Sequence, residues 1–298
     1  MGTRAAAQGV TWLITPGSEP GRYPAALTCG PDVALLDLED SVPAELKQQA
    51  RTAALDFLID TTLQTTTQTT VETTVEMPVL GLRINAPGTV CGLRDLLALT
   101  DTAARPAVLL IPKVEAARDV DLVADVLGTD RPALWALIES PQAISRLPGI
   151  LSARALAGVV FGAADYAAAA RCRRTDRALL YPRAALAAAA AAAGLPAVDS
   201  PYFDLADPGG LRREAQQARD LGFTGKGAVH PKQLPSIQTA FQPSADELDH
   251  ARAVVRAADT TAGISTDSSG QMVGPPLVAA ARALLQQAET TRTPPGAT

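Results

Sequence analysis

Short apolar runs separated by polar, helix-like stretches recur along most of this chain. The runs lie at residues 10–15, 33–38, 79–84, 108–111, 133–138, 158–161 and 197–198, and one more lies within GFTGKGAVHPKQ at residues 222–233. Runs of this length, bounded by turn residues, are typical of strands that are buried on both faces of a parallel sheet. Strands that alternate with helices predict right-handed crossovers. About eight such units predict an α/β fold, the TIM (β/α)8 barrel.

Helical patterns fill the spaces between these runs and continue beyond the last of them. Helices are expected at residues 43–58, 115–127, 184–193 and 208–221, and two further helical segments at 244–262 and 275–288. The last two are joined by GISTDSSGQMVGP, a flexible-looking link that would let the final helix act as an arm or lid. We therefore predict a barrel domain at residues 1–240 and a C-terminal helical extension at residues 241–298.

A threonine-rich insert interrupts the barrel pattern. Residues 61–76 read TTLQTTTQTTVETTVE, a low-complexity segment. Such a composition carries no chemistry of its own. We predict either an irregular surface loop or a β-like excursion there.

Composition excludes several classes of protein. The formal net charge is −5 and no basic stretch stands out, which argues against a nucleic acid as partner. Cys29, Cys91 and Cys172 have no paired spacing, so a CxxC metal or redox motif is excluded and a reducing, cytoplasmic setting is expected. No signal peptide is evident at the start, and the apolar run at residues 184–193 is too short to span a membrane.

Polar side chains follow the carboxyl ends of these runs, where a barrel places its chemistry. Charges scattered at random over a surface would not fall so regularly at strand ends, so we predict one shared active site. The rim would collect Asp37, Glu39, Asp40, Arg83, Asn85, Lys113, Glu139, Asp165, Asp199 and His230.

Two of these acids follow consecutive runs. The apolar run of LWALIES stops at Glu139, and Asp165 lies beyond the Gly162 turn in GVVFGAADY. Neither run contains an obvious basic neighbour, and hard carboxylate oxygens suit Mg2+. The pair is therefore a candidate for a shared divalent cation. The simpler alternative is that each acid caps the helix that follows it.

The basic residues of the rim have alternatives of their own. Arg83 can hold a substrate carboxylate bidentately or form an ion pair with the acidic DLED segment, and both can hold at once. Lys113 is expected to hold Glu39 or Asp40 in place, since neighbouring acids would keep its amine protonated and disfavour a Schiff base. His230 either starts the last barrel helix or takes part in catalysis.

A family resemblance rests on eight segments in a fixed order. They are LITPGSEPGRYPAAL, LLDLEDSVP, LRINAPGT, LIPKVE, ALIES, VVFGAADY, GLPAVDSPYFDLAD and GFTGKGAVHPKQL. Over about residues 11–254 the chain resembles the citrate lyase β-subunit-like branch of the HpcH/HpaI aldolase superfamily. The resemblance implies a TIM barrel, commonly trimeric, that uses Mg2+ to cleave or form a C–C bond in acyl-CoA substrates such as citryl-, malyl- or citramalyl-CoA.

The resemblance also implies roles by position. It places metal binding on Glu139 and Asp165, and the grip on the substrate carboxylate on Arg83. We accordingly predict catalytic roles for Arg83, Asp37, Glu39, Asp40 and Lys113, and substrate-binding roles for Arg83, Asn85, Gly162 and Ala163. The expected partners are a 2-oxo acid, such as oxaloacetate, pyruvate or glyoxylate, and an acyl-CoA. Neither nucleic acid nor membrane is expected as a partner.

The chain departs from the family pattern near its C-terminus. Lyases of the malyl-CoA and citramalyl-CoA type carry a DGxMxD-type segment whose last Asp acts as acid or base in a neighbouring subunit, whereas SSGQMVGPP here puts Gly274 at that place. Either Asp267 or a DLED carboxylate replaces that group, or the lyase reaction is altered or lost. Pro141 and Ala143 depart from the family pattern as well, at a place that shapes the pocket.

Three other functions therefore stay open. The protein is then an aldolase acting on free 2-oxo acids without CoA, a non-catalytic scaffold that binds ligand, or a β-subunit within a larger citrate lyase complex.

Overall fold

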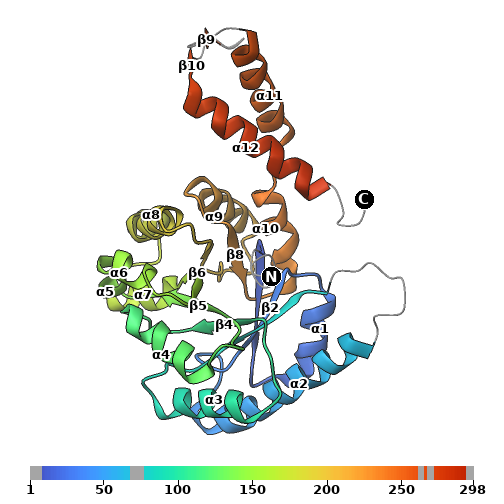
Figure 1. The fold of residues 1–298 in the computed structure, drawn as a ribbon, viewed down its shortest axis with the longest axis vertical. Helices are drawn as coiled ribbons and strands as arrows, with labels where there is room; N and C mark the ends of the chain where they lie inside the picture. Colours follow the sequence, from blue (N-terminus) through green and yellow to red (C-terminus); the bar gives the residue numbers. More distant parts are fainter. Residues whose placement is uncertain (1–8, 68–76, 261–264, 267–271, 293–298) are drawn as a thin grey trace. The chain divides into compact units, whose positions relative to one another are not determined.

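The computed structural model describes residues 9–67, 77–260, 265–266 and 272–292. Within these ranges, eight parallel strands pair in chain order and close into a barrel, because β1 also pairs with β8 (Figure 1). The strands are β1 (Thr11–Pro16), β2 (Val33–Asp37), β3 (Val79–Arg83), β4 (Val108–Ile111), β5 (Ala133–Ile138), β6 (Leu156–Phe161), β7 (Ala197–Asp199) and β8 (Gly225–Ala228). This confirms the TIM barrel predicted from the apolar runs, each of which overlaps one strand.

Alternate side chains of the strands fill the inside of the barrel. Trp12, Leu35, Leu110 and Trp135 belong to one buried cluster there, and the ring centroids of Trp12 and Trp135 lie 4.5 Å apart. The intervening side chains, such as Leu13, belong instead to a second buried cluster between the strands and the surrounding helices. Burying one large apolar side chain contributes about 1.5–3 kcal/mol, so these two layers stabilise the barrel on both faces of its sheet.

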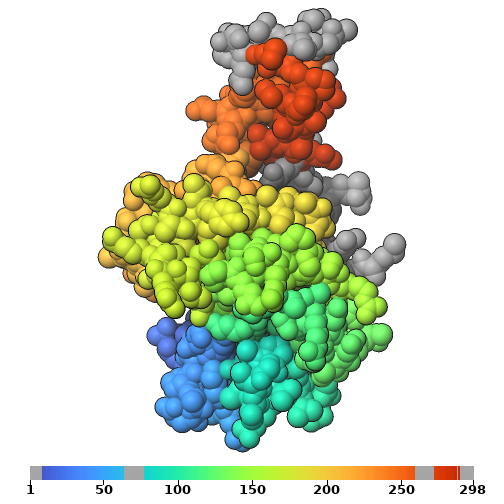
Figure 2. All heavy atoms as spheres, turned by 90° about the vertical axis from the view of Figure 1, so that its left-hand side faces the viewer, coloured from blue at the N-terminus to red at the C-terminus, as the bar shows by residue number. Residues whose placement is uncertain are grey.

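Helices surround the strands, and in Figure 2 their side chains cover one side of the barrel. They are α1 (Tyr23–Thr28), α2 (Lys47–Thr67), α3 (Val90–Asp101), α4 (Ala117–Leu127), α5 (Pro141–Ser145), α6 (Leu147–Leu151), α7 (Ala163–Ala169), α8 (Asp176–Ala192), α9 (Pro208–Asp220) and α10 (Leu234–Phe241). Short 3-10 helices are η1 (Pro20–Arg22), η2 (Ala44–Leu46) and η3 (Pro231–Gln233). In the described part of the chain, no helix combines the length and apolar character that crossing a membrane requires.

Helix α2 extends beyond its expected end. α2 continues through Thr67, so the first part of the threonine-rich insert is helical rather than a loop or β-like excursion. The hydroxyls of Thr61 and Thr62 donate to the carbonyls of Phe57 and Leu58, four residues earlier, which satisfies them within the helix. The rest of the insert, residues 68–76, lies outside the described residues.

Helix α3 was not anticipated from the sequence. Its N-cap is Thr89, whose hydroxyl accepts a hydrogen bond from the backbone N–H of Gly92. The helix matters for the site because it carries the buried Asp95, which holds the turn after β3.

The C-terminal segment forms a compact unit of its own. The chain divides into Met1–Phe241 and Gln242–Thr298. In the second unit, α11 (Ala245–Thr260) packs on α12 (Pro275–Arg292), and the buried Ala251, Val254, Val273 and Ala281 form its small core. The predicted flexible link contains β9 (Ser265–Thr266) and β10 (Met272–Val273), which pair antiparallel, while Asp267 lies outside the described residues.

One glycine is set by the packing inside the barrel. A Cβ added to Gly158 of β6 would lie 2.5 Å from the ring of Trp135, well inside van der Waals contact. We therefore expect Gly158→Ala to lower the free energy of unfolding by about 1–3 kcal/mol, the usual cost of overpacking a core, measured by urea denaturation. The matched control is Gly149→Ala in α6, where an added Cβ meets nothing within 4 Å. Equal stability of the two variants would contradict this account.

Candidate active site

A cavity of about 390 Å³ lies at the carboxyl ends of the barrel strands. The apolar side chains of Ile14, Leu110, Leu137 and Val160 line it together with polar residues from the strand ends. Among the predicted site residues, those that line it are Asp37, Asp40, Arg83, Glu139, Gly162, Ala163 and Asp165. The barrel thus gathers seven of them around one pocket, as the rule for barrel enzymes predicts.

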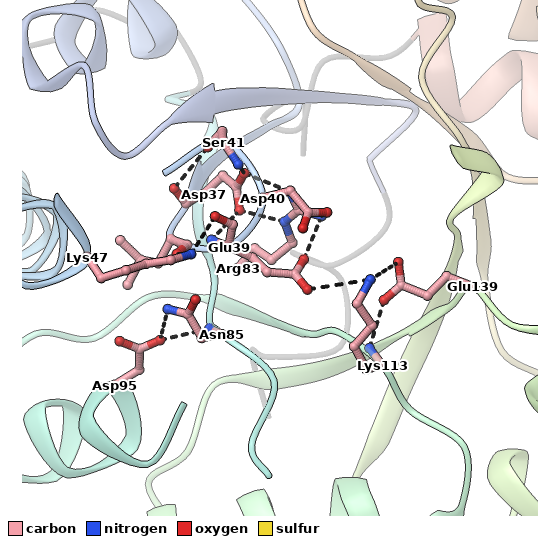
Figure 3. A network of polar contacts seen from close by, with 11 residues as sticks. Asp37, Glu39, Asp40, Ser41, Lys47, Arg83, Asn85, Asp95, Lys113 and Glu139 are labelled. Carbon is pink, nitrogen blue, oxygen red and sulfur yellow. Dashed lines mark hydrogen bonds and ion pairs between the residues drawn. The ribbon is translucent and has the colours of Figure 1, made fainter. Parts of the chain in front are cut away.

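Arg83 is fixed by the acid on the neighbouring strand. Asp37 of β2 and Arg83 of β3 are direct register partners, and Nε and Nη2 of the arginine donate to the two carboxylate oxygens at 2.6 Å each (Figure 3). Burial raises the pKa of Asp37, but the hydrogen bonds and charge of Arg83 outweigh it and hold that pKa below the ordinary value. Both sequence-based alternatives for Arg83 therefore stay open, because Arg83 forms the ion pair with Asp37 and also lines the cavity.

Glu39 lies between the two basic residues of the rim. Its Oε2 is 3.0 Å from Nη1 of Arg83, and its Oε1 is 3.7 Å from Nζ of Lys113. Burial raises the pKa of Glu39 to about 7, although the charge of Arg83 acts in the opposite direction. This carboxyl can therefore exchange a proton near neutral pH.

The acidic loop has a support that sequence reasoning missed. Nζ of Lys47 donates to the backbone carbonyls of Leu38 at 2.8 Å and Glu39 at 2.6 Å. Lys47 is the first residue of α2, so the helix start holds the DLED segment in place. Nothing in the apolar pattern marks this lysine. Asp40, by contrast, is largely exposed and lies 3.7 Å from Arg83.

Glu139 and Asp165 converge on one positive charge. Nζ of Lys113 lies 3.2 Å from Oε2 of Glu139 and 2.8 Å from Oδ1 of Asp165. The backbone N–H of Lys113 also donates to Oε1 of Glu139 at 2.8 Å, which fixes this carboxylate. Gly162 leaves room for it, because a Cβ there would lie 2.5 Å from the Cβ of Glu139.

The two acids differ in their proton affinity. Burial, and next the charge of Glu39, raise the pKa of Glu139 to about 8. Burial also raises the pKa of Asp165, but hydrogen bonds from Lys113 and Glu139 outweigh it and leave that pKa below its ordinary value. Such opposite shifts in one pocket are typical of functional sites.

Three rim residues point elsewhere. Asn85 donates from its backbone N–H and its side chain to Oδ2 of Asp95, 2.7 Å away in both cases, and does not line the cavity. Asp199 accepts from Arg183 of α8 and from the fully buried Lys226 of β8, and does not line the cavity. Nδ1 of His230 accepts from the backbone N–H of Lys232 as the N-cap of η3, which is the helix-start alternative.

The pair Glu139 and Asp165 fits a Mg2+ ion. Oε2 of Glu139 is buried and accepts no hydrogen bond from any described residue, and both acids already face the same ammonium group. The described residues contain no cluster of three or more His, Cys, Asp or Glu side chains arranged for a metal. Mg2+ commonly binds through one or two carboxylates and completes its shell with water and substrate oxygens, so two acids suffice.

Comparisons with known proteins show the family of this chain. The model of the HpcH/HpaI aldolase/citrate lyase family matches residues 11–231, so the chain belongs to that family, as its motifs predicted. It is 32% identical to citrate lyase subunit beta of Escherichia coli (strain K12), over 93% of this chain and 92% of that protein. It is 34% identical to (3S)-malyl-CoA thioesterase of Cereibacter sphaeroides (strain ATCC 17029), over 82% and 81%.

Solved structures of the family include CitE from Mycobacterium tuberculosis in complex with magnesium, acetoacetate and coenzyme A. Its superposition gives a TM-score of 0.80 at 31% identity, and covers 95% of this chain and 99% of that one. The likeness therefore extends over the fold and the sequence together.

The raised pKa values of Glu39 and Glu139 predict how stability depends on pH in the metal-free protein. Their pKa values are about 7 and 8 when folded, against an ordinary 4.5, so the unfolded chain loses these protons at lower pH than the folded one. The free energy of unfolding should therefore fall as the pH rises from about 5 to 8.

Glu139→Gln removes one of these two ionisations and keeps the shape of the side chain. With EDTA present, the variant should match the wild type at pH 5 and exceed its stability at pH 8 by on the order of 1–3 kcal/mol, since one pKa unit corresponds to about 1.4 kcal/mol. Urea denaturation at pH 5, 6, 7 and 8 measures this. If the free energies of unfolding of the two proteins differ by the same amount at every pH from 5 to 8, the raised pKa of Glu139 is refuted.

Proposed function

We propose that this protein is a Mg2+-dependent carbon–carbon lyase or aldolase. It cleaves or forms a bond between a 2-oxo acid and the enolate of an acyl-CoA, in substrates of the citryl-, malyl- or citramalyl-CoA type. The convergence of Glu139 and Asp165 on one cation position, in the cavity that Arg83 also lines, carries this proposal. The family membership, and the names of the relatives that act on citrate or malyl-CoA, support it.

Arg83 is the group that orients the substrate. Asp37 holds its guanidinium through two hydrogen bonds of 2.6 Å and Glu39 lies 3.0 Å from Nη1, so the direction of this group at the cavity is set before a substrate carboxylate binds. A bound Mg2+ would supply Lewis-acid polarisation of the substrate oxygens and stabilise the negative charge that develops on them. Glu139 and Asp165 would hold that ion, with Glu139 fixed by the backbone N–H of Lys113.

Glu39 is our candidate for the residue that moves a proton. Its pKa of about 7 suits a group that takes up and releases a proton near neutral pH, and Arg83 lies within 3.0 Å of it. Gly274 stands at the position of the family's C-terminal acid and has no side chain that can carry a proton. Of the two replacements that the sequence offers, Asp267 and a DLED carboxyl, we propose Glu39 of DLED for this role.

The resemblance adds further parts to the proposal. We infer a homotrimer in a reducing, cytoplasmic setting, in which the C-terminal helices act as an arm or lid. Gly274 favours one alternative function, in which the site binds its ligands without lyase turnover. The relative named as a malyl-CoA thioesterase favours another, hydrolysis of the thioester.

A substrate panel separates these functions. Citryl-, malyl- and citramalyl-CoA and free 4-hydroxy-2-oxo acids are incubated with the full-length protein and Mg2+, and both the released 2-oxo acid and the released CoA thiol are measured. A C–C lyase releases 2-oxo acid from the CoA esters, whereas a thioesterase releases free thiol alone. Release of 2-oxo acid from the free hydroxy-oxo acids only would favour the CoA-independent aldolase. If no substrate releases 2-oxo acid or thiol, the protein that binds ligand without turnover is favoured.

Removing either metal ligand should abolish turnover. We expect Glu139→Gln and Asp165→Asn each to lower the Mg2+-dependent release of 2-oxo acid by on the order of 100-fold or more, because both carboxylates hold the ion that stabilises the transition state. The control is Asp130→Asn, since Asp130 is an exposed surface residue. Circular dichroism checks that the variants stay folded. Wild-type rates in either ligand variant would remove the metal from the mechanism.

The role of Glu39 is tested by the pH profile. Glu39→Gln should lower kcat by on the order of 100-fold, as expected for the loss of a general acid or base, and should remove the limb of the kcat–pH profile near pH 7. If the kcat–pH profile of Glu39→Gln keeps its change near pH 7, Glu39 is not the residue that transfers the proton. A gain of activity in Gly274→Asp, together with that result, would move the proton transfer to the C-terminal unit.

A further inference from the structure

Lys113 grips one carboxylate with two different groups. Its backbone has a φ of 57°, in the left-handed region that a lysine seldom adopts. In this conformation the backbone N–H reaches Oε1 of Glu139 at 2.8 Å, while the ammonium of the same residue lies 3.2 Å from Oε2. Strained backbone of this kind occurs where the surrounding structure requires it. Here it brings one hydrogen bond, from the backbone N–H, and one ion pair, from the ammonium, to the same acid.

The ammonium also contacts the other acids that surround the cation position. It lies 2.8 Å from Oδ1 of Asp165 and 3.7 Å from Oε1 of Glu39, and Figure 3 shows it between Glu139 and the cluster around Arg83. The carboxylates of Glu39, Glu139 and Asp165, which follow three different strands, therefore share the positive charge of one ammonium. Without it, Glu39 would keep its ion pair with Arg83, whereas the nearly buried Glu139 would lose the ion pair that compensates its charge.

A metal ion cannot bind beside this ammonium unchanged. Mg2+ lies about 2.0–2.1 Å from its oxygen ligands. An ion held by Oε2 of Glu139 and Oδ1 of Asp165 would lie close to Nζ of Lys113, which contacts the same two oxygens, and two positive charges at such a short distance repel strongly. The side chain must therefore move before or as the metal binds.

We propose that the Lys113 ammonium occupies the metal position in the metal-free protein, and that binding of Mg2+ displaces it. The inference rests on the proposed metal site. The side chain of Lys113 is 40% exposed, so it has a way out to solvent. The backbone N–H does not take part in this movement and keeps Oε1 of Glu139 in place. The ligand thus stays oriented for the metal while the internal cation leaves.

The exchange has a quantitative consequence for the affinity. The apparent dissociation constant equals the intrinsic constant divided by the fraction of molecules in which the site is open. Lys113 lowers that fraction, so it weakens metal binding. In return, its ammonium compensates the charge of the acids when the metal concentration is low. Removing the ammonium should tighten binding.

The test is Mn2+ binding to the full-length protein, measured by electron paramagnetic resonance at fixed pH and ionic strength. Lys113→Met removes the ammonium, and Lys113→Gly does so while suiting the left-handed backbone, in case the first variant folds poorly. The control is Lys232→Met, at an exposed lysine of η3. We expect both Lys113 variants to bind Mn2+ about tenfold or more tightly than the wild type, which corresponds to an open fraction of about a tenth or less. The control should be unchanged.

Two results would count against the inference, and they differ. Affinities of the Lys113 variants equal to or weaker than that of the wild type would overturn the displacement and leave the metal site intact. Failure of every protein to bind Mn2+ would overturn the proposed metal site and the displacement with it.

Tighter binding in the Lys113 variants would also follow if the ammonium stayed in place and only repelled the metal. A crystal structure distinguishes this from displacement of the ammonium. In wild-type crystals with Mn2+, Nζ of Lys113 should have left ion-pair distance of both Glu139 and Asp165, while its backbone N–H still contacts Glu139. An ammonium that still contacts both carboxylates beside the bound metal would overturn the proposal.

Discussion

Mutual repulsion among acids is the constraint on which this site depends. Five carboxyl groups, from Asp37, Glu39, Asp40, Glu139 and Asp165, lie at one end of the barrel, and ion pairs with Arg83 or Lys113 compensate them. Charges removed from water are costly unless they are paired. The acids respond in two ways: Asp37 and Asp165 are held ionised by their partners, whereas Glu39 and Glu139 retain protons to higher pH. A divalent cation would relieve the same repulsion.

The surrounding fold supplies the positions that this balance requires. Strand register sets Asp37 opposite Arg83, and the start of α2 holds the acidic loop through Lys47. The turn after β3 is fixed by Asn85 and by Asp95 of α3, and Arg51 in turn donates to that aspartate at 2.6 Å. Supports of this kind keep catalytic groups within the narrow geometry that they need. Much of the site's definition therefore lies in residues that do not line the cavity.

The sequence predicted the barrel and most of the cavity because both follow from periodicity. Buried strands appear as apolar runs, and a parallel barrel brings every strand end to the same rim, so Glu139, Asp165 and Arg83 were found from their places alone. Side-chain direction has no such signal. Asn85 and Asp199 follow strands as the others do, yet they bond to Asp95 and to Arg183.

Other features depend on contacts between distant segments. Lys47 lies in a polar helix start, and its function becomes visible only where its ammonium meets the loop after β2. The threonines at the end of α2 favour a loop or a β-like excursion by composition, yet they are helical, and the hydroxyls of Thr61 and Thr62 bond to the preceding turn. The position of Lys113 between Glu139 and Asp165 could not be predicted, because it depends on how three strand ends lie in space and neither acidic run contains a basic residue.

The two neighbouring indoles inside the barrel have a practical consequence. The chain has two tryptophans, Trp12 and Trp135, and both are buried in the same cluster, whose members Leu110 and Val160 also line the cavity. Intrinsic fluorescence at indole wavelengths therefore arises from the barrel unit alone and is silent for the unit from Gln242 to Thr298. Comparison of emission with far-ultraviolet ellipticity during denaturation would resolve whether the two units melt as one cooperative system or in succession.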